Sequence, residues 1–510
     1  MNSTIDTRDT QRPASVRPER AADAARRGHA RPDTAPRAAF DRAVLLLIGL
    51  YLLSLPLMTH DIRAADEIEY FAYLHSVAFD RDLDFLNEYA YFVDRFPEKY
   101  ACAPGSPPPP ACKKFKETFI DTITPTGLRP NFGPIGTAIV WAPFYAVGHL
   151  VALGARAAGS SSPVDGYAKP YLWAITLGSA FCSLAGLLLA YALCRSIVGQ
   201  AAAFWATLTI WLGTPVIFYS HLAPGYSHAA SLFAVGLFLF LWARWRDDLG
   251  VWRAVLLGVV GGLIAMIREQ DALFLLVPVL YGAFAVVGAL RDGRWRAAAG
   301  MVARVAVVGI AAIVTFVPQL LTYQILNGTP RPNKDVSDKM DIMSPHLWPV
   351  LTDPAHALPY WSPIVLLALA GLLLLIRHNP PLGLALIVGF LLTWYINGAI
   401  KTWTTAGSFG ARRFLNCTPI FVVGLAYAYE ALLSAGRSRP ALRRALVPLI
   451  SLLAIAWNAG LMIQFVLAEP WMNRQLLEWP RVLVNQFRLP AALPGIIRQF
   501  VNDKGSFYAE

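Results

Sequence analysis

The sequence predicts an all-α integral membrane protein with about eleven transmembrane helices. Of its 510 residues, 56% are hydrophobic and only 15% are charged, a composition too apolar for a soluble multidomain protein. Apolar runs long enough to cross a bilayer of about 30 Å recur between residues 43 and 467. Several of these runs contain Gly or Pro, which packed membrane helices tolerate.

The basic charge of the chain does not indicate a nucleic-acid partner. The formal net charge is +11, but nine arginines lie within the first 42 residues. The segment 1–42 is rich in Arg, Ala, Pro and Asp, which predicts a disordered basic tail. Arg37 and Arg42 precede the first predicted transmembrane helix, 43–59, so the positive-inside rule places the tail in the cytoplasm.

The remaining topology depends on one apolar stretch, Pro134 to Gly159, which contains Pro143 and His149. Counting it as a span inverts every later loop. If it instead lies in the membrane interface or re-enters, twelve arginines face the cytoplasm and seven basic residues face outside, as the positive-inside rule favours. We therefore expect an outside C-terminus. The remaining regions are an extracytoplasmic acidic loop at 60–169, a helix bundle at 170–467 and an extracytoplasmic interfacial tail at 468–510.

The start of the first loop gathers acidic residues among aromatic ones. These acids are Asp66, Glu67, Glu69, Asp80, Asp82 and Asp84. Carboxylates beside a bilayer are costly to desolvate, so their clustering marks a candidate catalytic site, although a solvated acidic loop is the alternative. Asp66 is our first choice for a general base, with Glu67 and Glu69 beside it. Asp82 and Asp84 form a D-x-D pair that suits a divalent cation such as Mg²⁺ or Mn²⁺, or simply a solvated turn.

A basic turn late in the chain is the expected partner of these acids. In GSFGARR, Gly407 and Gly410 would let the backbone approach a phosphate, and Arg412 and Arg413 suit bidentate phosphate binding. Anchoring to lipid headgroups is the alternative for both arginines. Lys401 and Arg268 are expected behind them, although Arg268 also suits an ion pair within REQD.

Two histidines and two cysteines complete the candidate residues. His221 and His228 flank the turn HLAPGYSH and suit either a metal or sugar site or a hydrogen-bonded turn. Cys102 and Cys112 bracket the Pro-rich segment APGSPPPPA. This spacing favours a disulfide in an oxidising compartment, which would stabilise the loop by ~3 kcal/mol.

Several of these segments, in this order, resemble the bacterial GT-C glycosyltransferase superfamily. They are DEIEYFAYLHSVAFDRDLDF, PNFGPIGTAIVWAPFY, GTPVIFYSHLAPGYSHA, IREQDALF and GSFGARRF. The resemblance extends from about Ala43 to Phe421 and is greatest to the branch near the protein O-mannosyltransferases, aminoarabinose transferases and RgtA/B/C/D-like proteins. HLAPGYSH stands where many relatives have Arg followed by an acid, which leaves the use of a metal open.

The resemblance implies a bacterial inner-membrane enzyme that uses a polyprenyl-phosphate-linked sugar donor. The acceptor would be a glycan, lipid or protein on the extracytoplasmic face, and an acid of the first loop would act as base or metal ligand. A lipid-linked sugar flippase or transporter is one alternative, but the sequence contains no convincing inverted repeat. A lipid-linked oligosaccharide polymerase or ligase is another, although its large loop is usually late in the chain.

Overall fold

The computed structural model describes residues 41–100, 114–404, 407–434, 440–473 and 476–504. The chain divides into a short unit, Met1–Leu45, and a large unit, Leu46–Glu510. The described residues of the short unit include the first four of helix α2 (Arg42–Ser54). Cys102 and Cys112 lie outside the described residues, so their pairing stays a prediction.

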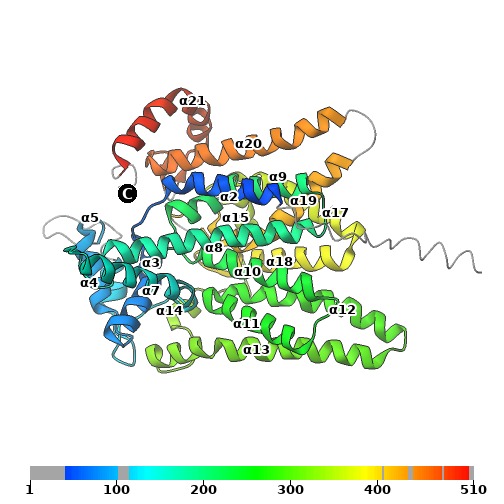
Figure 1. The fold of residues 1–510 in the computed structure, drawn as a ribbon, viewed down its shortest axis with the longest axis horizontal. Helices are drawn as coiled ribbons and strands as arrows, with labels where there is room; N and C mark the ends of the chain where they lie inside the picture. Colours follow the sequence, from blue (N-terminus) through cyan, green and yellow to red (C-terminus); the bar gives the residue numbers. More distant parts are fainter. Residues whose placement is uncertain (1–40, 101–113, 405–406, 435–439, 474–475, 505–510) are drawn as a thin grey trace, which may run out of the picture. The chain divides into compact units, whose positions relative to one another are not determined.

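Long apolar helices form the body of the large unit, and most run side by side along the horizontal of Figure 1. They are α8 (Lys169–Arg195), α9 (Gln200–Leu212), α10 (His228–Trp245), α11 (Val251–Ile267), α12 (Leu276–Arg291), α13 (Trp295–Asn327), α17 (Ile364–His378), α18 (Pro380–Ala399), α19 (Thr418–Ser434) and α20 (Pro440–Val466). Glycines let some of these helices pack closely. A Cβ on Gly371 of α17 would collide with the backbone of Gly424 in α19, which is typical of helix packing in membranes.

Eight helices of the described chain are long and apolar enough to cross a membrane. They are Gly136–Ala157, Lys169–Arg195, His228–Trp245, Glu269–Arg291, Trp295–Asn327, Pro380–Ala399, Arg412–Ser434 and Ala441–Val466. The chain is therefore a multi-pass helical membrane protein, as predicted. The expected count of about eleven is not confirmed, because three further apolar helices, Arg42–Leu57, Val251–Ile267 and Ile364–His378, are shorter.

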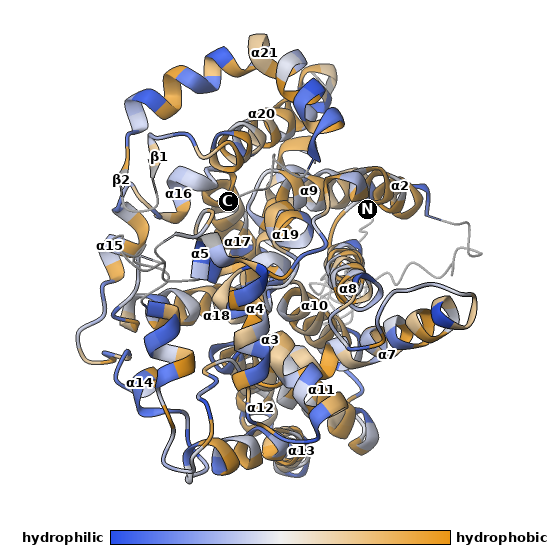
Figure 2. Cartoon of the chain, turned by 90° about the vertical axis from the view of Figure 1, so that its left-hand side faces the viewer, coloured by the Kyte–Doolittle hydropathy of each residue, from blue (hydrophilic) through white to orange (hydrophobic). Residues whose placement is uncertain are grey.

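The ambiguous apolar stretch forms helix α7 (Gly136–Ala157). Figure 2 views the left-hand end of Figure 1 and shows α10 and α19 end-on, whereas α7 lies across the view. Its first residue packs against the end of α11, where a Cβ on Gly136 would lie 2.3 Å from the backbone carbon of Met266. Helix α7 therefore crosses the direction of the bundle, although its length and composition would also suit a span.

The remaining elements are short or lie near the ends of the long helices. They are η1 (Leu55–Leu57), α3 (Ala65–His75), η2 (Ser76–Asp80), α4 (Leu86–Arg95), α5 (Pro97–Tyr100), η3 (Lys116–Asp121), η4 (Phe218–Leu222), η5 (Glu269–Leu275), α14 (Lys334–Ser337), α15 (Leu347–Thr352), α16 (Leu358–Trp361), η6 (Arg412–Cys417) and α21 (Trp479–Asn502). Strands β1 (Met472–Asn473) and β2 (Leu476–Leu477) form a small antiparallel pair, with Met472 opposite Leu477.

The first loop is a folded layer with its own aromatic core. Phe71 of α3 packs edge-on against Phe92 of α4, with their ring centroids 5.5 Å apart. Trp141 of α7 and Tyr89 of α4 are fully buried in the same core. Buried aromatic side chains of this size contribute strongly to packing. This core therefore holds α3, whose first turn carries the expected catalytic acids, in a fixed position.

Candidate active site at the first turn of α3

The sequence DE at the start of α3 places its two carboxylates on different faces of the helix. Glu67 is 3% exposed and turns back to the helix start, where its Oε2 accepts hydrogen bonds from the backbone N–H groups of Arg63 (2.8 Å) and Ala64 (2.9 Å). An acid in this position satisfies backbone donors that the first helical turn leaves unpaired. Asp66 does not accept these backbone hydrogen bonds, and its side chain is 45% exposed.

Asp66 forms a salt bridge with Arg412 of the late basic turn. Arg412 Nη1 donates to Asp66 Oδ2 at 3.0 Å, and the Arg412 side chain is 18% exposed. The same guanidinium lies over the ring of Tyr226, 5.0 Å from its centroid, which is a favourable cation–π geometry. The two sequence segments that we expected to form one site are therefore in direct contact.

The backbone before Arg412 depends on glycine. Gly410 has a φ of 63°, and a Cβ there would lie 2.5 Å from Pro215 Cγ. Glycine adopts this left-handed conformation without the strain that a side chain would add. Tyr219 of η4 fixes the same turn, because its hydroxyl donates to Phe409 O (3.2 Å) and accepts from Phe409 N (3.1 Å). The position of Arg412 is thus determined by several contacts.

Two further arginines, Arg268 and Arg413, lie near Arg412 at this end of the bundle. Arg268 Nη1 donates to His228 Nδ1 at 3.0 Å, and its Nε lies 3.9 Å from Asp271 Oδ1. Arg413 Nη2 donates to Thr402 Oγ1 at 3.1 Å, whereas its buried Nη1 has no hydrogen-bond partner among the described residues. Arg413 interacts electrostatically with Arg412, Arg268 and Asp66. A cluster of guanidinium groups with one unused donor suits a phosphate.

Glu69 lies one helical turn after Asp66 and is 7% exposed. Burial, and then the negative charge of Asp66, raise the pKa of Glu69 well above its usual range, although the Phe132 N–H donates to its Oε1. Burial also raises the pKa of Glu67, against the opposing effect of its backbone donors. Asp66 is thus the exposed acid of the three.

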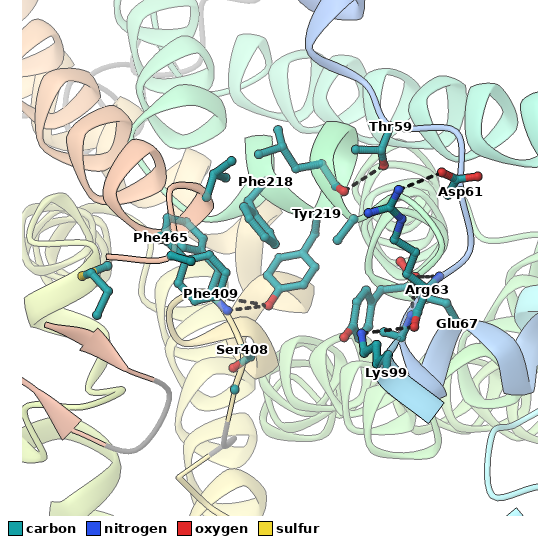
Figure 3. A pocket seen from close by; sticks show the side chains of 18 of the residues that line it. Thr59, Asp61, Arg63, Glu67, Lys99, Phe218, Tyr219, Ser408, Phe409 and Phe465 are labelled. Atoms are coloured by element: carbon teal, nitrogen blue, oxygen red, sulfur yellow. Dashed lines mark hydrogen bonds and ion pairs between the residues drawn. The ribbon is translucent and has the colours of Figure 1, made fainter. Parts of the chain in front are cut away.

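A cavity of about 520 Å³ lies near the pair of Asp66 and Arg412, although neither of these two residues lines it. It lies between the start of α3, the η4 turn, residues Gly407–Phe409 and the end of α20, and Glu67 and Tyr226 line it. Its two sides differ in chemistry (Figure 3). One side carries the rings of Phe218, Phe409 and Phe465, and the other carries Asp61, Arg63, Glu67 and Lys99. Such a cavity suits a ligand with an apolar part and a polar part.

The expected metal ligands do not come together. Asp82 Oδ1 accepts from Ser76 Oγ (2.9 Å) and from Asp84 N (3.1 Å), so this pair shapes a turn. His221 Nε2 lies 2.9 Å from Ser54 Oγ inside the bundle, whereas His228 pairs with Arg268. In the described ranges, one group of donor atoms suits a metal, and it contains none of these residues or Asp66. A metal at Asp66 therefore does not fit the residues present.

The other expected residues take secondary places. Lys401 is exposed, and its backbone N–H donates to Lys339 O at 2.7 Å. Arg268 forms an ion pair with Asp271, which was the alternative interpretation of the REQD segment. Sequence reasoning missed Tyr219, Tyr226 and Lys99. The first two flank HLAPG as an aromatic pair, which is the only signal that points to them.

Comparisons with known proteins assign no family. No family model matches the chain, and no curated protein matches it. Among solved structures, the archaeal oligosaccharyltransferase AglB from Archaeoglobus fulgidus, in complex with an inhibitory peptide and a dolichol-phosphate, matches with a TM-score of 0.46 and 13% identity over 84% of this chain and 56% of that one. The apo form of the Archaeoglobus fulgidus oligosaccharyltransferase matches with a TM-score of 0.45 and 14% identity over 83% and 57%.

A third solved structure, of the same oligosaccharyltransferase with Zn and sulfate, has a TM-score of 0.45 and 15% identity over 82% of this chain and 52% of that one. The chain thus spans little more than half the length of the proteins it matches. Similarity at this level identifies neither a family nor an activity.

Proposed function

We propose that this protein is a membrane glycosyltransferase of GT-C type. It would move a sugar, a hexosyl or pentosyl group, from a polyprenyl-phosphate donor to a glycolipid, polysaccharide or protein on the extracytoplasmic face. The observation that carries the proposal is the contact between Asp66 and Arg412 beside an amphipathic cavity. It joins an acid that can accept a proton to a cation that can hold a leaving phosphate.

The chemistry assigns a separate task to each member of the pair. As the acceptor oxygen bonds to the anomeric carbon of the sugar, Asp66 takes the hydroxyl proton. The bond between that carbon and the phosphate oxygen breaks, and the polyprenyl phosphate leaves with the electron pair. Arg412, with Arg413 beside it, stabilises the growing negative charge on the phosphate. The products are the glycosylated acceptor and the free lipid phosphate.

The salt bridge also gives an order to these events. Before the donor binds, Asp66 and Arg412 neutralise each other. A phosphate that takes over Arg412 competes with Asp66 for the guanidinium, so donor binding releases the carboxylate for the acceptor hydroxyl. Arg413 interacts electrostatically with Arg412, so its charge would add to the positive potential at the same phosphate. The aromatic side of the cavity would accept the first part of the lipid chain.

The proposed topology has eleven spans, a cytoplasmic N-terminus and an outside C-terminus in a bacterial inner membrane. The spans are α2, α8, α9, α10, α11, α12, α13, α17, α18, α19 and α20. Helix α7 lies along the interface, as its direction in Figure 2 supports. The arginine distribution then puts Asp66 and Arg412 outside the cytoplasm.

The experiment that tests the function uses Asp66→Asn, which keeps the shape of the side chain but removes the base. Mass analysis of cell-envelope glycans should show one sugar modification missing from a deletion strain. A copy of the gene with Asp66→Asn should not restore it, whereas the control Asp335→Asn, which alters an exposed acid of the short helix α14, should restore it fully. Purified Asp66→Asn should still bind polyprenyl phosphate, while its transfer rate falls by at least ~100-fold. Full restoration by Asp66→Asn would overturn the assignment of the base.

A further inference from the structure

A second polar cluster lies at the other end of α3, away from Asp66. His75 is the last residue of α3, Asp80 ends η2, and Glu88 lies in the first turn of α4. His75 Nδ1 is 2.7 Å from Glu88 Oε1 and 3.3 Å from Asp80 Oδ2. One donor atom from each residue lies within 4.8 Å of the other two.

The second ring nitrogen of His75 has a partner of its own. His75 Nε2 lies 3.0 Å from the carbonyl oxygen of Asp165, which can only accept, so Nε2 carries the hydrogen. Nδ1 lies at hydrogen-bond distance from the Glu88 carboxylate, so without an ion it carries a proton there, and a metal ion at this site would displace that proton. Metal-binding histidines commonly donate their other N–H to a backbone carbonyl in this way. The rings of Phe79 and Tyr167 stack against His75 and fix its plane.

The burial of Glu88 and its unpaired carboxylate oxygen point to a bound cation. Its side chain is fully buried, and its Oε2 has no hydrogen-bond partner. A buried carboxylate with an unpaired oxygen is costly unless a positive charge compensates it. Once an ion displaces the Nδ1 proton of His75, Asp80 and Glu88 together carry two negative charges, which a divalent cation would neutralise.

We infer that His75, Asp80 and Glu88 bind a divalent transition-metal ion, for which Zn²⁺ has the most suitable chemistry. One imidazole nitrogen and two carboxylate oxygens are ordinary zinc ligands, with bonds of about 2.0–2.2 Å. The Tyr167 hydroxyl lies 3.2 Å from His75 Nδ1, so a further oxygen is present at the site. Mg²⁺ and Ca²⁺ prefer sites made of oxygen alone, which disfavours them beside an imidazole.

The position of the site in the fold indicates a structural role. His75 lies nine positions after Asp66 along α3, which is about 14 Å at 1.5 Å per residue, so an ion at His75 does not touch a substrate at Asp66. It would instead tie α3 to α4 and to the 165–167 segment. His75, Asp80 and Glu88 would act as positioning residues for Asp66 in the proposed reaction, but zinc binding itself does not depend on that function.

The test measures zinc on the full chain in detergent after treatment with a chelator and dialysis. We expect elemental analysis to find one Zn²⁺ per chain and Zn²⁺ to raise the unfolding temperature, whereas Mg²⁺ and Ca²⁺ do not. Glu88→Gln and His75→Phe, which keep shape and stacking but remove ligands, should weaken zinc binding by at least ~100-fold. Asp94→Asn, an exposed acid of the same helix α4, is the matched control and should bind zinc as the unaltered protein does.

Each other outcome overturns the inference. Absence of zinc from the unaltered protein, with no thermal shift, would show a proton-held pair of His75 and Glu88. Equal zinc binding by Glu88→Gln and by the control would place the ion elsewhere. If the buried substitutions fail to fold, Asp80→Asn decides the question, because Asp80 is an exposed ligand whose loss should still weaken zinc binding at least tenfold.

Discussion

Asp66 and Arg412 are 346 residues apart in the chain, yet their side chains form a salt bridge of 3.0 Å. Because the Asp66 side chain is nearly half exposed, a surface pair of this kind contributes little to stability. We therefore propose that the pair serves function rather than stability. In the proposed reaction the pair would keep a base and a phosphate-binding cation adjacent, and each would block the other until a ligand binds.

Arg412→Ala should weaken binding of polyprenyl phosphate by at least tenfold, because a charge-assisted contact to the phosphate is lost. Arg412→Lys should be intermediate, since an ammonium cannot hold two oxygens in the same plane. Asp66→Asn should leave binding intact or tighten it, because it removes the competitor for Arg412. Fluorescence titration of the purified variants measures all three. The control is Arg331→Ala, which alters an exposed arginine. If Arg331→Ala and Arg412→Ala lost the same affinity for polyprenyl phosphate, binding would depend on overall positive charge and not on a site at Arg412.

Several features of the site were predictable from residue order alone. The apolar runs predicted the membrane helices, and the opposed charges of the first loop and the GSFGARR turn predicted that these segments meet. The exposure of Asp66 and the burial of Glu67 were not predictable. Neighbouring residues on a helix point about 100° apart, so the two carboxylates face different directions, and the surrounding aromatic core determines which of them is buried.

The His75 cluster shows a second limit of sequence reasoning. His75 and Glu88 are 13 residues apart and become neighbours only because η2 and a turn bring α4 back against α3. The turn needs Asp82 as an acceptor for Ser76 and for the Asp84 backbone, so the acids that looked like metal ligands shape the chain instead. His221 is likewise buried inside the bundle, where its ring contacts the Ser54 hydroxyl. Contacts of this kind follow from tertiary packing, which the local pattern does not contain.

Glu67→Ala should lower the free energy of unfolding by about 1–2 kcal/mol, because the first turn of α3 loses the acceptor of two backbone N–H groups. Glu67→Gln keeps an oxygen in the same place and should retain most of the stability and activity. Thermal unfolding in detergent and sugar transfer measure the two effects. An inactive but fully stable Glu67→Gln protein would show that Glu67 acts in catalysis rather than as a cap.

The stability of the protein should depend on pH through Glu69. Burial and the charge of Asp66 raise the pKa of Glu69 in the folded state above the ordinary value of 4.5. The folded state therefore binds a proton that the unfolded state has released, and this contribution to stability is lost as the pH rises through the folded pKa. Glu69→Gln, which mimics the protonated acid, should reduce the loss of stability that accompanies the rise in pH. Unfolding temperatures measured from pH 4.5 to pH 9 compare the two proteins, and parallel curves would contradict the prediction.

The topology can be tested at two loops on opposite sides of α10. The arginine distribution places Gly225 outside and Asp248 in the cytoplasm, with α7 in the interface. A periplasmic phosphatase fused after Gly225 should be active, and one fused after Asp248 inactive. A cytoplasmic reporter should show the opposite pattern at the same two sites, which controls for expression. The reverse result with both reporters would make α7 a true span. Asp66 in the first loop would then lie across the membrane from Gly225, which contradicts their contact through Glu67.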